Sequence, residues 1–404
     1  MSLKKLQIPT GMQDTLPGEC EARNRLEAAF RGLFRAYGYR EIRTPILEYY
    51  DTLSEQPYGY RPEHVWKTFD GAGHILTLRP DSTIPAARIA AGPMKDAAFP
   101  LRLCYLQSAT TYQVDTLSML CEQPQAGVEL MGEAGSLADA EVIDLALHCL
   151  QAAGLRDWQI ELGQAGFFTG FLREAGLSDI QAHEVRQLVE RKDSFGIQMY
   201  LQQERVPADV TARLMRLPRL YGDEAVLDEA EALTRDPACR AALASLREVI
   251  GHLRILNPDV AVTIDLGMAQ EASYYSGIIF RGHAAGAGQP ILSGGRYDGL
   301  TERFGRSMPA VGFALMTKLL MIALERQGIR FETPAADVLI GCGPASAAEA
   351  LREASRLRAE GQTVAMIYRA DEDLLAQRLR AGDARRALLY TDGGLRELRE
   401  EGMD

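Results

Sequence analysis

The stretch EQPQAGVELMG, residues 122–132, decides how the middle of this chain folds. It reads as a strand in which apolar residues surround an amide, a glycine and a carboxylate. Since side chains alternate between the two faces of a strand, Gln125, Gly127 and Glu129 share one face. A core strand rarely buries an unpaired carboxylate, because its desolvation is costly, so this face predicts a polar slot for a small ligand. If the face lies in solvent instead, the pattern has no functional meaning.

The segments around this strand predict a largely antiparallel sheet with helices against it. The loops between neighbouring strands are too short for parallel crossovers. Expected strands are YREIRTPILEYY (39–50, with Pro45 at an edge or interface), HILTLRP (74–80), LRLCYL (101–106), WQIELG (158–163), VAVTIDLG (260–267), YYSGIIF (274–280) and PILSGG (290–295). Expected helices are 20–37, 84–91, 137–154 and one that begins near Val311.

The pattern of elements divides the chain into three kinds of structure. Residues 177–256 read as helical throughout, broken at prolines, which predicts a helical insertion between a first core part, 1–176, and a second, 257–331. Residues 332–404 alternate β-α-β-α-β and predict a small parallel α/β domain that stops after its third strand. The fold class is therefore α+β, with a helical insertion and a small C-terminal domain.

Composition excludes several classes of protein. The 404 residues are 47% hydrophobic and 25% charged, and no apolar run approaches the roughly 20 residues that cross a bilayer. Six scattered cysteines without a C-x-x-C pair, and no signal peptide, predict a reducing cytoplasmic location, no disulfides and no metal site. A net charge of −11 argues against broad nucleic-acid binding. The common hydrolase and nucleotide-binding motifs are absent, so no cofactor is expected.

Three further segments concentrate polar groups, and each has a plain structural alternative. In TLRPDSTIPAARIA (77–90), Ser82 or Thr83 can cap a helix, at whose N-terminus Asp81 is also favourable. Alternatively, Asp81 and a hydroxyl face a cleft that suits an ammonium group. In the Tyr274–Tyr275 pair one phenol faces a pocket, or both pack in the core. Finally, the glycines of ILSGGRYDGLTERFG (291–305) permit positive φ or close backbone approach, or form an ordinary hairpin.

In this order, the polar segments resemble histidyl-tRNA synthetase over about residues 8–325, apart from the helical insertion. The resemblance implies a class II aminoacyl-tRNA synthetase-like antiparallel sheet, a homodimer through this core, and a shortened anticodon-binding-like domain at 332–404. The motifs that carry it are PTGMQDTLP (9–17), YGYREIRTPIL (37–47), LRPDST (78–83), RLCYL (102–106) with QAGVELMG (125–132), ASYYSGIIF (272–280), SGGRYDGL (293–300) and PAVGFAL (309–315).

The positions that match the family's histidine pocket are largely kept. Asp81, one methylene shorter than the family's glutamate, and Thr83 match the α-amino contacts, and Gln125 matches a backbone-group contact. The resemblance assigns the imidazole to Glu129 and Tyr275. Tyr297 matches a neighbour of the ring.

The positions that match the family's ATP site are not kept. Amino-acid activation develops charge at the ATP α-phosphate that pre-placed cations must meet, and losing one such donor costs about 3–4 kcal/mol. The motif-two arginine falls at Thr111 and its nearby glutamate at Gln113, while the first histidine motif's arginine falls at Gln270. The motif-three arginine falls at Leu319, beside Lys318. We therefore expect no catalysis.

A histidine pocket without ATP chemistry resembles the regulatory subunit family of ATP phosphoribosyltransferase. This resemblance implies a non-catalytic subunit that activates the short-form catalytic subunit at the first step of histidine biosynthesis, in a hetero-octamer, with L-histidine as the feedback effector. No membrane or nucleic-acid partner is expected. The alternatives are an authentic histidyl-tRNA synthetase, another histidine-binding synthetase paralogue, and a binding module with a different ligand.

Overall fold

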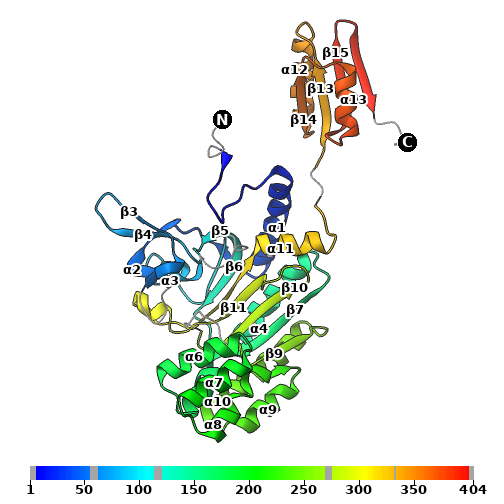
Figure 1. The fold of residues 1–404 in the computed structure, drawn as a ribbon. Helices are drawn as coiled ribbons and strands as arrows, with labels where there is room; N and C mark the ends of the chain where they lie inside the picture. The colour runs from blue at the N-terminus through cyan, green and yellow to red at the C-terminus, as the bar shows by residue number, and fades with distance from the viewer. Residues whose placement is uncertain (1–5, 55–61, 113–120, 269–274, 332–333, 400–404) are drawn as a thin grey trace. The chain divides into compact units, whose positions relative to one another are not determined.

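The structure is a computed structural model, and it describes residues 6–54, 62–112, 121–268, 275–331 and 334–399 (Figure 1). The chain divides into two compact units, Met1–Arg330 and Phe331–Asp404. The first unit holds a nine-stranded sheet, a three-stranded sheet and most of the helices. Each unit is described by itself below.

The nine-stranded sheet is predominantly antiparallel, as expected. Its order is β1-β5-β6-β12-β11-β10-β7-β9-β8, and only the pairs β1–β5 and β7–β9 are parallel. The strands are β1 (Arg40–Glu41), β5 (Leu101–Thr110), β6 (Glu122–Met131), β7 (Trp158–Gln164), β8 (Tyr221–Gly222), β9 (Val262–Asp265), β10 (Ile278–Ala284), β11 (Leu292–Arg296) and β12 (Ala310–Met316). The segment EQPQAGVELM forms β6, which lies between β5 and β12 and therefore inside the sheet.

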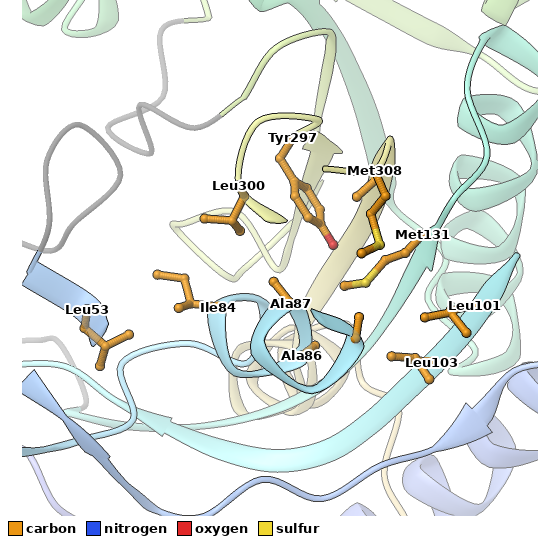
Figure 2. Packing of buried hydrophobic residues seen from close by; sticks show 12 residues of the cluster. Leu53, Ile84, Ala86, Ala87, Leu101, Leu103, Met131, Tyr297, Leu300 and Met308 are labelled. Carbon is orange, nitrogen blue, oxygen red and sulfur yellow. The ribbon is translucent and has the colours of Figure 1, made fainter. Parts of the chain in front are cut away.

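Helices cover both faces of this sheet. α1 (Pro17–Ala36) sets Phe34 edge-on against Phe313 of β12, and α4 (Ser136–Ala152) packs beside it against β12. α3 (Thr83–Ala91) lies on the other face, where Leu103 and Met131 point. In Figure 2 the side chains of α3 face those of Tyr297 and Met308 across one apolar cluster. α11 (Thr317–Arg326) follows β12 directly and contacts α1 and β6.

The segment expected to begin a helix near Val311 is instead strand β12, and the helix starts at Thr317. β12 pairs with β6 on one side and β11 on the other, and its residues are largely buried. A strand buried on both faces loses the alternation that marks a strand in sequence. Its apolar run therefore could not be told from a helix by periodicity.

The strand expected over 39–50 is divided between two sheets. β1 joins the large sheet, while β2 (Leu47–Tyr49) pairs with β4 (Ile75–Leu78), which pairs with β3 (Lys67–Phe69). Pro45 lies between β1 and β2, in neither strand. Because proline has no N–H to give to a ladder, the chain changes sheets there.

The segment after β7 is helical but not entirely so. Its helices are α5 (Ala165–Glu174), α6 (Asp179–Glu190), α7 (Ser194–Gln203), α8 (Ala208–Leu214), α9 (Ala225–Leu233) and α10 (Pro237–Leu256), which Figure 1 shows gathered near β9. The sequence showed no strand here, yet Tyr221 and Gly222 form β8 at the edge of the large sheet. Two residues are too short to show a period, and only their pairing with β9 makes them a strand.

The second unit carries one more strand than expected. β13 (Ala336–Cys342), α12 (Ala347–Ala359), β14 (Val364–Tyr368), α13 (Glu372–Arg380) and β15 (Ala384–Thr391) alternate as predicted, and β13 pairs in parallel with both β14 and β15. β16 (Gly394–Arg399) then returns antiparallel to β15. Its charged, exposed sequence GLRELR lacks an apolar face, so the pattern did not reveal it.

Candidate functional site

Glu129 is the centre of a buried polar cluster on β6. Its side chain is only 1% exposed, and three hydroxyls donate to its carboxylate. Thr83 Oγ1 donates to Oε1 at 2.8 Å, Tyr105 Oη donates to Oε1 at 3.3 Å, and Tyr297 Oη donates to Oε2. Burial raises the pKa of Glu129 to about 8, and the hydroxyl donors work against that rise. Within the described part of the chain, the carboxyl group is therefore held by hydroxyls and not by a cation.

Two glycines provide the space that this cluster occupies. Gly312 of β12 lies directly opposite Glu129, and a Cβ there would stand 1.9 Å from Oε2. A Cβ on Gly127 would stand 2.6 Å from the ring and hydroxyl of Tyr105. No side chain fits at either distance, so the cluster depends on both glycines. The sequence pattern predicts Gly127 beside the pocket, but it does not reveal Gly312 or Tyr105.

The turn before α3 delivers two hydroxyls to this face of the sheet. The prediction that the Ser82 or Thr83 side chain caps α3 is wrong. Asp81 Oδ1 instead accepts the Ile84 N–H at 3.0 Å. The hydroxyl of Ser82 lies 3.5 Å from Gln125 Oε1, and that of Thr83 reaches Glu129. Asp81, Ser82 and Gln125 are all buried. The structure thus brings the predicted residues of LRPDST next to those of QAGVELMG.

Gln107, which no motif in the sequence indicates, extends the cluster away from Glu129. Its Nε2 donates to Ser82 Oγ at 3.0 Å and to Thr44 Oγ1 at 3.2 Å, while its Oε1 accepts the Thr44 N–H at 3.2 Å. It lies opposite Gln125 in the β5–β6 register. A glutamine on a strand has no distinguishing sequence signal, so only the pairing of β5 with β6 reveals it.

The two tyrosines predicted to line the pocket approach the cluster from the far side. Tyr297, 1% exposed, bonds Glu129, and Tyr275 is half-buried against the apolar cluster around α3. A Cβ on Gly295 would lie 2.7 Å from the Tyr275 ring, so this glycine serves close approach. Gly294 and Gly295 lie within β11 and do not have positive φ, which excludes the hairpin and a phosphate cradle before a helix. Tyr274 lies outside the described residues.

The positions matched to lost ATP contacts carry no cation where the structure describes them. Thr111 follows β5, and its backbone is held by the Cys121 carbonyl at 2.8 Å and by Trp66 Nε1 at 3.3 Å. Leu319 lies in α11 and is half-buried. The neighbouring Lys318 pairs with Glu19 of α1 and thereby ties two helices together. Gln113 and Gln270 lie outside the described residues.

A buried cation, Arg79, does lie beside the end of β5, but its donors point at the protein itself. It is 5% exposed and bonds the carbonyls of Thr44 at 2.8 Å, Pro45 at 2.9 Å and Ser108 at 2.5 Å. Burial lowers the pKa of its guanidinium. Since its donors are taken up by backbone oxygens, Arg79 joins three chain segments instead of offering charge to a ligand.

Arg296, the cation of the SGGRYDG motif, is also structural. It is 6% exposed and pairs with Asp139 of α4 at 2.7 Å and with Asp298 at 3.0 Å. This pairing holds β11 against α4 and orients the turn that carries Tyr297.

Across the described ranges, no group of three or more His, Cys, Asp or Glu could hold a metal ion. None of the described helices is long and apolar enough to cross a membrane.

The sheet, its helix covering and this polar cluster define a histidyl-tRNA synthetase-like protein. The family model described as histidyl-tRNA synthetase matches residues 11–320. A histidyl-tRNA synthetase structure from Nostoc sp. PCC 7120 matches with a TM-score of 0.80 over 97% of this chain and 96% of its own, at 21% identity, which bears on the fold alone.

Closer relatives define the family further. The ATP phosphoribosyltransferase regulatory subunit of Acetivibrio thermocellus is 41% identical over 360 residues, which cover 89% of this chain and 86% of that protein. The regulatory subunit of Symbiobacterium thermophilum is 36% identical, over 92% and 94% of the two chains. A Bacillus halodurans structure described as a regulatory subunit/histidyl-tRNA synthetase has a TM-score of 0.82 at 30% identity, over 92% and 96%. The chain belongs to the ATP phosphoribosyltransferase regulatory subunit family.

Proposed function

We propose that this protein is a non-catalytic regulatory subunit that binds free L-histidine in the Glu129 cluster and controls a short-form ATP phosphoribosyltransferase catalytic subunit. The observation that carries the proposal is the buried carboxylate of Glu129, held by Thr83 and Tyr297 and, among the residues that the structure describes, without a paired cation. In this proposal the chain activates its partner at the first step of histidine biosynthesis, and histidine reverses that activation.

The chemistry of the cluster suits histidine. A carboxylate and a phenol can hold the two nitrogens of an imidazole, for which we propose Glu129 and Tyr275. Asp81 would bind the α-ammonium group together with Thr83, and Gln125 the remaining backbone polar groups. Tyr297 would orient Glu129 and pack beside the ring. Burial raises the pKa of Glu129 to about 8, so this carboxyl can act as a hydrogen-bond donor or acceptor toward an imidazole near neutral pH.

We propose that this chain does not catalyse amino-acid activation. Charge that develops on a transferring phosphoryl group needs preorganised cations, and neither Thr111 nor Leu319 supplies one. Gln113 and Gln270 are proposed as two more lost positions. The buried Arg79 does not replace the missing cations, because its N–H groups already donate to carbonyl oxygens.

Inhibition requires that histidine bind the less active assembly more tightly than the active one.

We propose a cytoplasmic hetero-octamer of this chain and the catalytic subunit, built on homodimers of the synthetase-like core. Residues 177–256 would be an insertion in that core, and 332–404 a shortened anticodon-binding-like domain. No nucleic-acid or membrane partner is included.

The exposed face of the three-stranded sheet supports the homodimer. Leu47 and Tyr49 of β2 lie opposite Leu78 and Leu76 of β4, so all four point to one face. Leu47 is 38% and Tyr49 55% exposed, and the preceding Ile46 is 59% exposed. An apolar surface of this kind on a sheet is typical of a protein interface.

The test is histidine inhibition of the reconstituted complex. The chain and a short-form catalytic subunit are co-purified, and phosphoribosyl transfer is assayed against histidine concentration. Glu129→Gln and Tyr275→Phe should weaken inhibition at least about tenfold, equivalent to about 1.4 kcal/mol, while the complex stays intact. Glu122→Gln, an exposed glutamate on the same strand, is the matched control. Inhibition that is unchanged in both pocket variants would reject the pocket.

A second assay separates this function from that of an authentic synthetase. The purified chain is incubated with histidine, ATP and labelled pyrophosphate. We expect no histidine-dependent exchange of label into ATP. Exchange at the rate of a working synthetase would favour histidyl-tRNA synthetase, and failure to co-purify with the catalytic subunit would favour a binding module with another partner.

A further inference from the structure

A cavity of about 340 Å³ lies between helices α5 and α6, on the helical side of the first unit. Its polar lining comes from Thr169, Arg173, Asp179, His183 and Arg186, and two leucines and an alanine complete the wall. The volume is within the range of small-molecule pockets, roughly 300–1,000 Å³. None of these residues belongs to the Glu129 cluster.

Arg186 is the unusual member of this lining. Its guanidinium lies 5.7 Å from the centre of the Phe168 ring, and its Nε is buried without a hydrogen-bond partner in the described chain. Glu190 is the acidic side chain that acts on Arg186 electrostatically, but its carboxylate pairs with Arg281 at 2.7 Å. Within the described ranges Arg186 forms no ion pair. The side chain is partly buried, and its terminal N–H groups, unlike Nε, are not enclosed, so they can reach an anionic ligand in the cavity.

The other polar groups of the lining limit the kind of anion. Arg173 is mostly exposed, and its 3.4 Å contact with Asp236 is a weak surface pair that a ligand can compete with. His183 Nε2 lies 2.9 Å from Gln187 Nε2, and Nδ1 of the same ring is a second polar atom of the lining. The carboxylate of Asp179 opposes a multiply charged ligand. A single carboxylate matches the fork of one arginine and the low net charge of the site.

We propose that this cavity is a second small-molecule site, which binds a monocarboxylate with an apolar body. The carboxylate is held by the terminal N–H groups of Arg186, with help from Arg173 and His183. The apolar body lies against Leu172 and Leu177, which line the same cavity. The site does not depend on histidine binding at Glu129.

Butyrate is a suitable probe, measured by ligand-detected NMR titration of the full chain at constant ionic strength. We expect saturable binding in the millimolar range that Arg186→Gln weakens at least about tenfold. Arg191→Gln, which changes an exposed arginine at the end of α6, is the matched control and should bind as the wild type does. Arg186→Lys keeps the charge and the stem on Phe168 but not the planar fork, and should also weaken binding even if the glutamine variant folds poorly.

Four results would overturn the proposal. The first is no saturable butyrate signal in the wild type, and the second is equal affinity in Arg186→Gln. The third is binding of inorganic phosphate that exceeds binding of butyrate, since this would make the site one for phosphate. Glu129→Gln should leave butyrate affinity unchanged, and its loss in that variant would place the binding in the Glu129 cluster instead. A failure of histidine binding at Glu129 would leave the expectations for butyrate as they are.

Discussion

Thr83, at the start of α3, and Glu129, near the end of β6, are joined by a 2.8 Å hydrogen bond between Oγ1 and Oε1. The two residues are 46 positions apart in the chain. Their contact ties the turn after β4 to the centre of the large sheet. It places a hydroxyl from LRPDST and a carboxylate from QAGVELMG within reach of the same small ligand.

Removing this hydroxyl should weaken the proposed pocket without emptying it. Thr83→Val deletes one donor to a buried carboxylate, which costs about 1–3 kcal/mol when the partner stays unsatisfied. We expect histidine affinity, measured by calorimetry, to fall about tenfold or more. Thr83→Ser retains the hydroxyl and should stay within about threefold of the wild type. A loss in Thr83→Ser, which lacks the methyl group, with none in Thr83→Val would mean that packing of the methyl group, and not the hydrogen bond, is responsible.

Burial of Glu129 should make stability depend on pH. Its pKa of about 8 lies above the ordinary value of 4.5, so the folded protein binds the proton more tightly than the unfolded chain does. The stabilising effect of this proton is present at low pH and is lost as pH rises through about 8. The free energy of unfolding should therefore fall between about pH 5 and 8, by up to about 1.4 kcal/mol per unit from this group.

Urea unfolding of the wild type and Glu129→Gln across this range isolates the effect. The variant cannot ionise, so its stability should decline less with rising pH than that of the wild type. Glu122→Gln, on the same strand but exposed, should keep the wild-type slope. Parallel curves for the wild type and Glu129→Gln would show that Glu129 titrates normally.

Arg79 should matter for stability and not for ligand chemistry. Arg79→Met leaves the carbonyls of Thr44, Pro45 and Ser108 without their buried donor, so we expect a loss of about 3 kcal/mol or more. Arg43→Met is the control, since its side chain is 79% exposed and should change stability by no more than about 0.5 kcal/mol. Chemical denaturation measures both. Equal effects would contradict a structural role for Arg79.

The proposed homodimer makes a prediction about the two faces of the small sheet. Tyr49→Asp puts a charge on the apolar face shared with Leu76, and sedimentation velocity should show a shift toward monomer. Phe69→Asp changes a side chain that is 70% exposed but lies on the opposite face, beside Ile75 in the register, and should stay dimeric. A monomeric wild type, or dissociation by Phe69→Asp alone, would reject this interface.

Much of the fold could be predicted from periodicity alone. The long helices α1 and α4, the strands around β6 and the alternation of the second unit follow local hydrophobic patterns, because each buries a single face or a continuous run. The failures have one cause in common. None of these strands has an alternating apolar pattern, because β12 is buried on both faces, β8 is two residues long and β16 is charged. Each is recognised as a strand only by its pairing with another strand in the structure.

The sequence by itself determined which residue types are present for the proposed histidine pocket and which cations are missing from the matched ATP positions. Only the tertiary structure decided what those groups do. It turned Ser82 and Thr83 from helix caps into donors toward β6, and it revealed Tyr105, Gln107 and Gly312 around Glu129. It also directed the donors of Arg79 to carbonyl oxygens. The reason is physical: the protonation of a carboxyl and the use of a cation depend on burial and on partners distant in the chain, which no local pattern encodes.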